Sequence, residues 1–144
     1  MDTEVPTIEA DTRQQITDLI IDFGWRVDHG LAATIHELVT DDIEMILTVG
    51  TIVGKDAVRS WGADRDALDR RSSHLMMNFR FPVVTLDRVE AHSNGLIFRH
   101  NGRDSIAPAL PWAVTEYQDI FVRLQGEWKF QTRLAQDIFM SDDA

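Results

Sequence analysis

Apolar residues near the start of the chain recur at intervals of three and four, the spacing of one face of a helix. The run consists of Ile16, Leu19, Ile20, Phe23 and Val27. We predict a helix over about residues 12–28, capped by Asp11 or Thr12 and ended by Gly30. Asp28 falls in its last turn beside the apolar stripe, where a carboxylate needs a partner because burying an unpaired charge is costly.

The next part of the chain alternates between helix and strand signals. A short helix is predicted over residues 31–38, and residues 39–42 are expected to end it, since Thr and Asp favour turns. The β-branched run 43–49 predicts a strand, and residues 51–53, between two glycines, predict the return arm of a hairpin. A third helix is predicted over residues 55–68.

Beyond these helices the hydrophobic period changes to two, which is typical of strands. The predicted strands are residues 74–90, 93–101, 112–124 and 127–139. Asn94-Gly95 and Gln125-Gly126 are predicted hairpin turns, and residues 101–111, rich in Gly and Pro, predict a longer loop. Since helices come first and an antiparallel sheet follows, the predicted class is α+β.

No internal repeat, low-complexity tract or linker divides the chain. Residues 1–144 are therefore predicted to form one domain, with a loose arm over residues 1–9.

Alternation along the strand that follows His74 predicts two faces of different character. One face would carry His74, Met76, Asn78 and Arg80. The other would carry Leu75, Met77, Phe79 and Phe81. The first face is suited to a semi-polar cavity. The second is apolar and is expected to be covered by packing within the chain or by another copy, so we expect a homo-oligomer.

Composition narrows the classes of function. The chain has 144 residues, no Cys and a formal net charge of −10, so disulfides and thiolate nucleophiles are excluded and nucleic acid is not an expected partner. No apolar run reaches membrane-span length, and the first residues lack a signal-peptide pattern, so a cytoplasmic location without membrane contact is expected. The histidines follow no metal-ligand spacing, and no Gly-rich phosphate loop precedes a helix; we predict neither a metal nor a cofactor.

Asp28 and His74 are the candidate catalytic pair. An imidazole exchanges protons near neutral pH, and a carboxylate partner orients the ring and stabilises its charged form. The alternatives are an Asp28 that meets local backbone or water, and a His74 that is hydrogen-bonded in the core without a substrate.

An apolar pocket beside this pair is predicted from scattered aromatic and Met residues. The candidates for substrate binding are Phe23, Trp25, Met45, Trp61, Met76, Asn78, Trp112 and Arg133. Most of the apolar ones are expected to be plain core, and Trp61 and Met45 are the preferred pocket residues among them. Arg133 is suited to a leaving group or an anionic substrate, or else to a salt bridge with Asp28 or Glu44, and Asn78 is suited to a substrate oxygen or a sheet-edge contact.

An ordered set of short stretches resembles the nuclear transport factor 2-like superfamily, and within it the SnoaL-like branch. The stretches are Val27-Asp28, residues 38–44, residues 50–54, His74, Asn78, Tyr117, residues 126–130 and Arg133. The resemblance covers nearly the whole chain. It implies a cone-shaped α+β barrel in which helices pack on a curved, mostly antiparallel sheet that encloses a pocket.

The Asp-then-His order most resembles hexachlorocyclohexane dehydrochlorinases, bile-acid dehydratases and scytalone dehydratase. Those relatives imply a lyase in which the base is His74, its support is Asp28 and Arg133 is a pocket arginine. They often carry Lys or Tyr five residues before the Asp, where this chain has Phe23, so a leaving-group donor is expected from elsewhere.

The resemblance implies elimination of water or halide, or double-bond isomerisation, on a small apolar or alicyclic ligand, by a dimer or trimer. One alternative is a proton shuttle that uses Asp28 alone. The other is a non-catalytic ligand- or protein-binding module, such as the small subunit of a ring-hydroxylating dioxygenase, because one fold serves many functions.

Overall fold

The computed structural model describes residues 6–103 and 110–141. Residues 1–5 of the predicted arm and 104–109 of the predicted loop lie outside the described residues. Within the described part, no helix is both long and apolar enough to cross a membrane.

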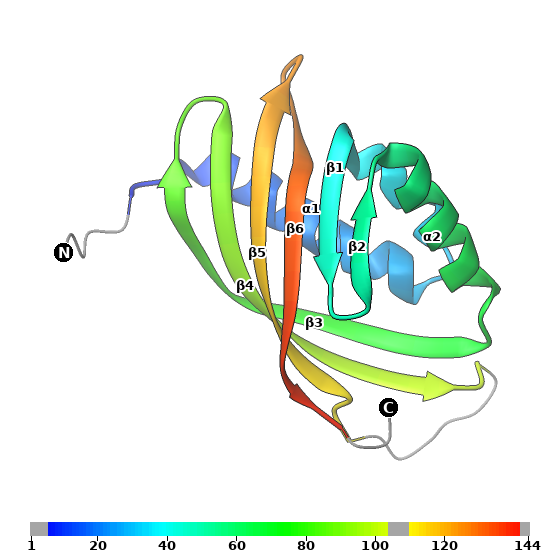
Figure 1. Cartoon of the computed structure of the whole chain (residues 1–144). Coiled ribbons are helices and arrows are strands. Elements are labelled where there is room, and N and C mark those ends of the chain that lie inside the picture. Colours follow the sequence, from blue (N-terminus) through cyan, green and yellow to red (C-terminus); the bar gives the residue numbers. More distant parts are fainter. Residues whose placement is uncertain (1–5, 104–109, 142–144) are drawn as a thin grey trace.

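Helices pack against a strongly curved sheet (Figure 1). Helix α1 (Ala10–Asp28) runs behind the sheet in this view, the 3-10 helix η1 (Ala32–Leu38) follows it, and α2 (Lys55–Ala67) lies beside the short strand β2. The strands are β1 (Val39–Leu47), β2 (Gly50–Val53), β3 (Arg70–Val84), β4 (Arg88–Asn101), β5 (Ala113–Leu124) and β6 (Glu127–Met140). The α+β class is confirmed.

The described strands form one six-stranded sheet in the order β2-β1-β6-β5-β4-β3. β1 and β6 run parallel, and the other neighbouring pairs are antiparallel. The predicted curved, mostly antiparallel sheet is therefore confirmed, as a cone that stays open between β2 and β3 and not as a closed barrel.

Helix boundaries follow the predictions with one correction. α1 begins at Ala10 after Glu9, so Asp11 and Thr12 lie inside the first turn and the predicted cap is wrong. Its predicted end is confirmed, because the backbone of Gly30 adopts a φ of +71°, a conformation that favours glycine and that a helix does not contain.

Residues 39–42, predicted as a turn, instead open β1. The pairing of β1 with β6 is irregular between Val39 and Glu44, and the side chains of Asp41 and Asp42 are exposed there. Because these polar side chains reach water at an irregular stretch of strand, the Thr and Asp residues did not have to form a turn.

The turn between the third and fourth strands lies at residues 85–87 and not at Asn94-Gly95. Thr85 closes it: its backbone N–H donates to Arg88 O at 2.8 Å, and its hydroxyl accepts from the Arg88 N–H at 3.0 Å. Gly95 lies inside β4, where an added Cβ would come 2.8 Å from the ring of Tyr117. This glycine therefore admits a neighbouring ring, which is a long-range reason that a turn motif does not reveal.

β3 begins four residues before its predicted start and carries an irregularity in its middle. Its pairing with β4 shifts between Met77 and Arg80, and Asn78 there has a φ of +59°. The predicted alternation of the two strand faces holds before this bulge and fails after it. Leu75 and Met77 are exposed, whereas Phe81 is 2% exposed and belongs to the core. The oligomeric state stays a prediction.

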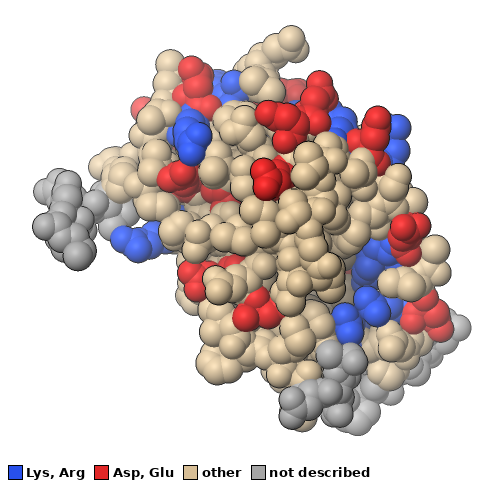
Figure 2. All heavy atoms as spheres, in the orientation of Figure 1, with Lys and Arg blue, Asp and Glu red and all other residues tan. Residues whose placement is uncertain are grey.

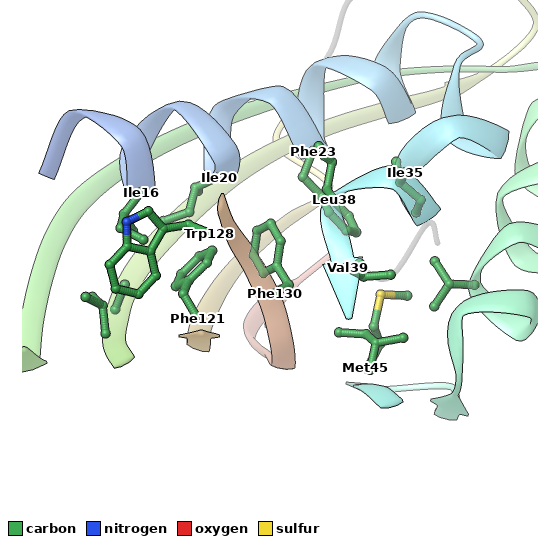
Figure 3. Close-up of a cluster of buried hydrophobic side chains, with 14 of the residues drawn as sticks. Ile16, Ile20, Phe23, Ile35, Leu38, Val39, Met45, Phe121, Trp128 and Phe130 are labelled. Atoms are coloured by element: carbon green, nitrogen blue, oxygen red, sulfur yellow. The ribbon is translucent and has the colours of Figure 1, made fainter. Parts of the chain in front are cut away.

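The core lies between α1 and the sheet (Figure 3). Phe130 contacts Phe23 edge-on at 5.4 Å between ring centroids and Phe121 at 4.4 Å. α2 packs closely on η1 because Gly62 has no side chain: a Cβ there would lie 2.0 Å from the carbonyl oxygen of Ala32. The last two predicted strands are confirmed, joined by the turn at Gln125-Gly126.

Candidate functional site

The end of α1 and the first half of β3 bring Asp28 and His74 together. Asp28 Oδ1 lies 2.6 Å from His74 Nδ1, and Asp28 Oδ2 accepts the backbone N–H of His74 at 2.8 Å. The carboxylate therefore orients both the ring and the backbone of the same residue. The Asp28 side chain is 9% exposed and that of His74 is 19% exposed.

Hydrogen bonding determines the charge state of this pair. Burial alone would raise the pKa of Asp28, but the hydrogen bonds from His74 and Ser72 hold that pKa below its usual value. An ionised carboxylate can only accept, so His74 Nδ1 carries the proton that joins the pair. The other ring nitrogen, Nε2, makes no hydrogen bond to the described residues, and in the neutral ring it is the basic nitrogen.

Ser72 and Arg65 support the carboxylate. The Ser72 hydroxyl donates to Asp28 Oδ1 at 2.6 Å and accepts from Arg65 Nη2 at 2.8 Å. Ser72 and His74 are two residues apart on one face of β3. The sequence-based strand began only at His74, so this spacing was not used to find Ser72 or Arg65.

Gly24 gives the His74 ring room against the helix. A Cβ added at Gly24 would lie 3.2 Å from His74 Cβ and 3.8 Å from Cγ. A glycine inside a helix costs about 1 kcal/mol relative to alanine. Its place here lets α1 and β3 approach closely enough for the Asp28–His74 hydrogen bond.

A cavity of about 660 Å³ opens beside the pair. His74 lines it, whereas Asp28 does not. Several predicted pocket residues do line it: Phe23, Met45, Trp61, Met76, Trp112 and Arg133. Further lining residues that the sequence-based reasoning did not select are Val27, Arg65, Arg70, Ile97, Arg99, Thr115, Tyr117, Ala135 and Asp137. The cavity therefore has apolar walls with a few polar groups.

Two predicted pocket residues lie elsewhere. Trp25 is 57% exposed and stacks on the ring of His29 at 3.7 Å, because its position on α1 turns it away from the sheet. Asn78 is exposed and its amide donates to Asn94 Oδ1 at 3.2 Å, because the bulge in β3 takes it out of phase with His74. Neither belongs to the candidate site.

Arg133 is held between aromatic rings in the cavity wall. Its guanidinium lies 4.4 Å from the ring centroid of Phe23 and 4.2 Å from that of Tyr117, and the residue is only 3% exposed. Its ion-pair partner is Asp119, with Nε 3.4 Å from Oδ1, and not Asp28 or Glu44. Aromatic faces on both sides keep the guanidinium plane in place.

Asp119 is the buried charge that the sequence-based reasoning missed. The approach of Arg133 lacks the alignment of a hydrogen bond, and neither Asp119 oxygen accepts one within the described residues. Burial raises the pKa of Asp119 to about 6, although the charge of Arg133 opposes the rise. One signal was available: this carboxylate lies two residues after Tyr117 on a face of β5 that is otherwise buried.

Tyr117 lines the cavity and carries a hydroxyl. Burial raises the pKa of this phenol, so it stays protonated at neutral pH and can donate a hydrogen bond. In the part of the chain described by the structure, no cluster of three or more His, Asp or Glu side chains is arranged to hold a metal ion.

Solved structures share this fold. A putative scytalone dehydratase from Novosphingobium aromaticivorans is 20% identical, with 92% of this chain and 87% of that one covered and a TM-score of 0.79. An NTF2-like protein with a cystatin-like fold from the same species is 23% identical, with 93% and 86% covered and a TM-score of 0.76. A type 2 hexachlorocyclohexane dehydrochlorinase is 20% identical, with 91% and 88% covered and a TM-score of 0.77.

No curated protein matches the chain significantly by sequence. The sequence profile of the SnoaL-like domain matches residues 9–134, which include every helix and strand described above except the last part of β6. The match agrees with the open cone of helices and sheet and with the fold of the solved neighbours. The chain belongs to the SnoaL-like domain family.

Proposed function

We propose that this protein is a lyase or isomerase in which His74 removes a proton from a small, largely apolar ligand. The observation that carries the proposal is the hydrogen bond of 2.6 Å between His74 Nδ1 and the Asp28 carboxylate, on a histidine that lines a cavity of about 660 Å³. A cavity of this size is typical of small-molecule sites.

The base is His74 Nε2. It takes a proton from a ligand carbon, and the imidazolium that forms is stabilised by the adjacent Asp28 carboxylate. The electron pair of the broken C–H bond then forms a double bond. Either a neighbouring halide leaves with its bonding electrons, or a neighbouring hydroxyl leaves as water by taking the proton that His74 removed, or an existing double bond moves and its far carbon takes that proton from His74. A positioned base of this kind contributes roughly 10²–10⁴-fold in rate.

Leaving-group stabilisation is assigned to two other residues that line the cavity. Phe23 cannot donate a hydrogen bond, but Arg133 and the Tyr117 hydroxyl both line the cavity. A fixed guanidinium stabilises a departing anion, and a phenol stabilises a departing oxygen. Arg133 and Tyr117 are therefore proposed to replace the Lys or Tyr donor whose position Phe23 occupies in this chain.

Two solved neighbours support this class of reaction, since one is named a putative scytalone dehydratase and another a hexachlorocyclohexane dehydrochlorinase. A shuttle that uses Asp28 alone is less well supported, because Asp28 does not line the cavity. The following experiment distinguishes an enzyme from a binding module without catalysis.

The test measures proton removal directly. Alicyclic alcohols, halides and ketones are incubated with the protein in D₂O, and deuterium incorporation and product formation are followed by NMR. His74→Ala is expected to slow exchange by roughly 10²–10⁴-fold, as expected for loss of a general base. Asp28→Asn is expected to slow it less, because the base remains but its orientation and charge stabilisation are impaired.

The matched control is His29→Ala. His29 is exposed at the end of α1, and its Nδ1 lies 2.7 Å from Trp25 O of the same helix. This variant is expected to exchange at the parental rate. A His74→Ala protein that retains the full rate would contradict the proposal, and ligand binding without any exchange in the parent protein would favour the binding module.

A further inference from the structure

Arg65, Arg70 and Arg99 line the same cavity as His74. Arg65 comes from the last turns of α2, Arg70 from the start of β3 and Arg99 from the end of β4. Basic side chains gather at the lower right of the molecular surface in Figure 2. Together with Arg133, which pairs with Asp119, these three residues make four arginines at one cavity, which is unexpected in a chain whose formal net charge is −10.

Strand register explains how these side chains meet. Ser72 pairs with Arg99 across β3 and β4, and Arg70 pairs with Asn101 one step further out. Arg70 and His74 are separated by an even number of residues, so their side chains share one face of β3. The Arg65 guanidinium reaches this face from α2, since Nη2 donates to the Ser72 hydroxyl at 2.8 Å.

None of the three arginines forms an ion pair within the described residues. Arg65 contacts Ser72, Arg70 Nε lies 3.4 Å from Asn101 Oδ1, and the Arg99 guanidinium lies 4.0 Å from the ring centroid of Trp112. Ion pairs do form elsewhere on this chain, for example between Arg26 and two carboxylates. A purely structural arginine in so acidic a protein would be expected to find such a partner.

Two acidic side chains near the cluster already accept hydrogen bonds from other donors, and a third is exposed. Asp66 accepts the backbone N–H groups of Ala32 and Ala33 at 2.8 and 2.9 Å. Asp137 accepts the hydroxyls of Thr48 and Thr115 at 2.8 and 2.7 Å. Asp64 also lines the cavity but is exposed and makes no ion pair within the described residues. The charges of Asp28 and Asp66 act on Arg65 without forming an ion pair, and no described carboxylate pairs with the three guanidinium groups, so these groups are available to an anionic ligand.

Mutual repulsion acts within the cluster. Burial and the charges of Arg70 and Arg103 lower the pKa of Arg65, although the charges of Asp28 and Asp66 oppose this change. Burial and the charges of Arg70 and Arg65 likewise lower the pKa of Arg99. Arginine nevertheless stays protonated at neutral pH, so like charges face one cavity. An anion between them would relieve this repulsion and accept several charge-assisted hydrogen bonds.

We propose that Arg65, Arg70 and Arg99 form a subsite for an oxyanion, a carboxylate or phosphate, carried by the ligand whose apolar body lies against Trp112 and Met76. The subsite rests on the proposed function only in that both take the cavity as a ligand site. It specifies the substrate class as an apolar acid. Guanidinium forks bind such groups bidentately, and the stacked Trp112 ring orients the fork of Arg99.

The spacing is consistent with a ring-sized ligand. His74 pairs with Ile97, so Arg99 is one two-residue step further along β4, about 7 Å of strand. Arg70 is four residues from His74 along β3, about 13 Å of strand. The anion would therefore be bound at one end of the ligand while a carbon at the other end reaches the base.

Binding calorimetry with three probes tests the subsite. The probes are cyclohexanecarboxylate, cyclohexyl phosphate and the neutral cyclohexanecarboxamide. The parent protein is expected to bind at least one acid about tenfold or more tightly than the amide, since hydrogen bonds to charged groups are the stronger kind. The preference is expected to weaken at high ionic strength, and whichever acid binds more tightly identifies the group.

Arg70→Gln and Arg99→Gln are the variants of choice, because Arg65 also contacts the support of Asp28 through Ser72. Each is expected to remove most of the preference for the acid and to leave binding of the amide unchanged, whereas Arg99→Lys is expected to retain part of it. The matched control is Arg59→Gln, which removes the same charge from an exposed position on α2 that does not line the cavity.

Equal binding of acids and amide, failure of both acids to bind, or a preference that survives both glutamine substitutions would overturn the subsite. Thermal unfolding of each variant checks that it is folded. The readout is binding, so it is independent of proton removal. An acid preference without deuterium exchange would leave the subsite standing and contradict the proposed function, and exchange without an acid preference would do the reverse.

Discussion

The space between α1 and the sheet has two ends built from the same elements. At the packed end, α1 contributes Ile16 and Ile20, β5 contributes Phe121 and β6 contributes Phe130, all fully buried. At the hollow end the same elements contribute smaller or polar residues that line the cavity. These are Gly24 and Val27 from α1, Thr115 and Tyr117 from β5, and Arg133 and Ala135 from β6.

This difference shows that the cavity arises from a change of side chains along continuous elements and needs no break in the backbone. Large apolar side chains are fully buried at the packed end. At the hollow end glycine and alanine leave volume empty, and buried polar groups take the place of contacts between apolar ones. The first end stabilises the fold, and the second is available for chemistry.

The largest expected effect concerns Asp119, on the cavity face of β5 between Tyr117 and Phe121. Its folded-state pKa of about 6 lies above the ordinary value of 3.8, so the folded chain keeps this proton after the unfolded chain has lost it. The group therefore favours folding at low pH, and that contribution is lost as the pH rises through about 6. The shift corresponds to a free energy of unfolding on the order of 3 kcal/mol.

Urea unfolding of the parent and of Asp119→Asn, from about pH 4 to about pH 7, checks this sign. The parent is expected to lose stability relative to the variant across that range by up to about 3 kcal/mol, because asparagine does not titrate. All other carboxylates are common to both proteins and cancel. Parallel stability curves would mean that Asp119 is equally ionised in the folded and unfolded states and would contradict this prediction.

Two substitutions that enlarge an alanine side chain test the contrast between the packed end and the hollow end. Ala91 is fully buried in the core, whereas Ala135 lines the cavity. Ala91→Leu is expected to lower the free energy of unfolding by about 1–3 kcal/mol through overpacking. Ala135→Leu is expected to change it by less than about 0.5 kcal/mol, since the added methyl groups enter open space, and to weaken ligand binding. Similar destabilisation in both variants would contradict the distinction.

The smallest expected effect on stability concerns Gly24→Ala. Alanine gains about 1 kcal/mol of helix propensity, which is offset by the contact of 3.2 Å with His74 Cβ. Net stability is therefore expected to change by less than about 1 kcal/mol, while displacement of the ring slows proton exchange roughly tenfold. Gln15→Ala, at an exposed position of α1, is the control. An unchanged exchange rate would show that His74 tolerates the displacement.

Local patterns predicted a large part of the fold. The periodicity of α1 and α2 and the alternation of β5 and β6 located these elements to within a few residues, because their signals come from neighbours in sequence. The turn between β3 and β4 was misplaced because Gly95 serves Tyr117 on another strand. The bulge at Asn78 was likewise invisible, since a shift in register depends on the partner strand.

The candidate site likewise contains residues that sequence patterns identified and residues that they missed. A carboxylate beside the apolar stripe of a helix pointed to Asp28, and its partner His74 was suggested by its place at a strand start and by family resemblance. Asp119 was missed because its burial follows from the pairing of β5 with β6, where it lies opposite Arg133. The arginine cluster was missed because it joins α2, β3 and β4, which only the tertiary structure brings to one cavity.

The order of the strands has a consequence for how the chain folds. β6 lies between β1 and β5, and it pairs in parallel with a strand that precedes it by about ninety residues. Within the sheet only β6 joins the early strands β1 and β2 to the later meander β3-β4-β5, so these two groups share no strand pairing until residues 127–140 have been synthesised. Such distant pairings make folding slow, in the range of milliseconds to seconds. Before β6 forms, one edge of β1 and one edge of β5 are unpaired. These are the edges that a chaperone would have to cover until β6 pairs with them.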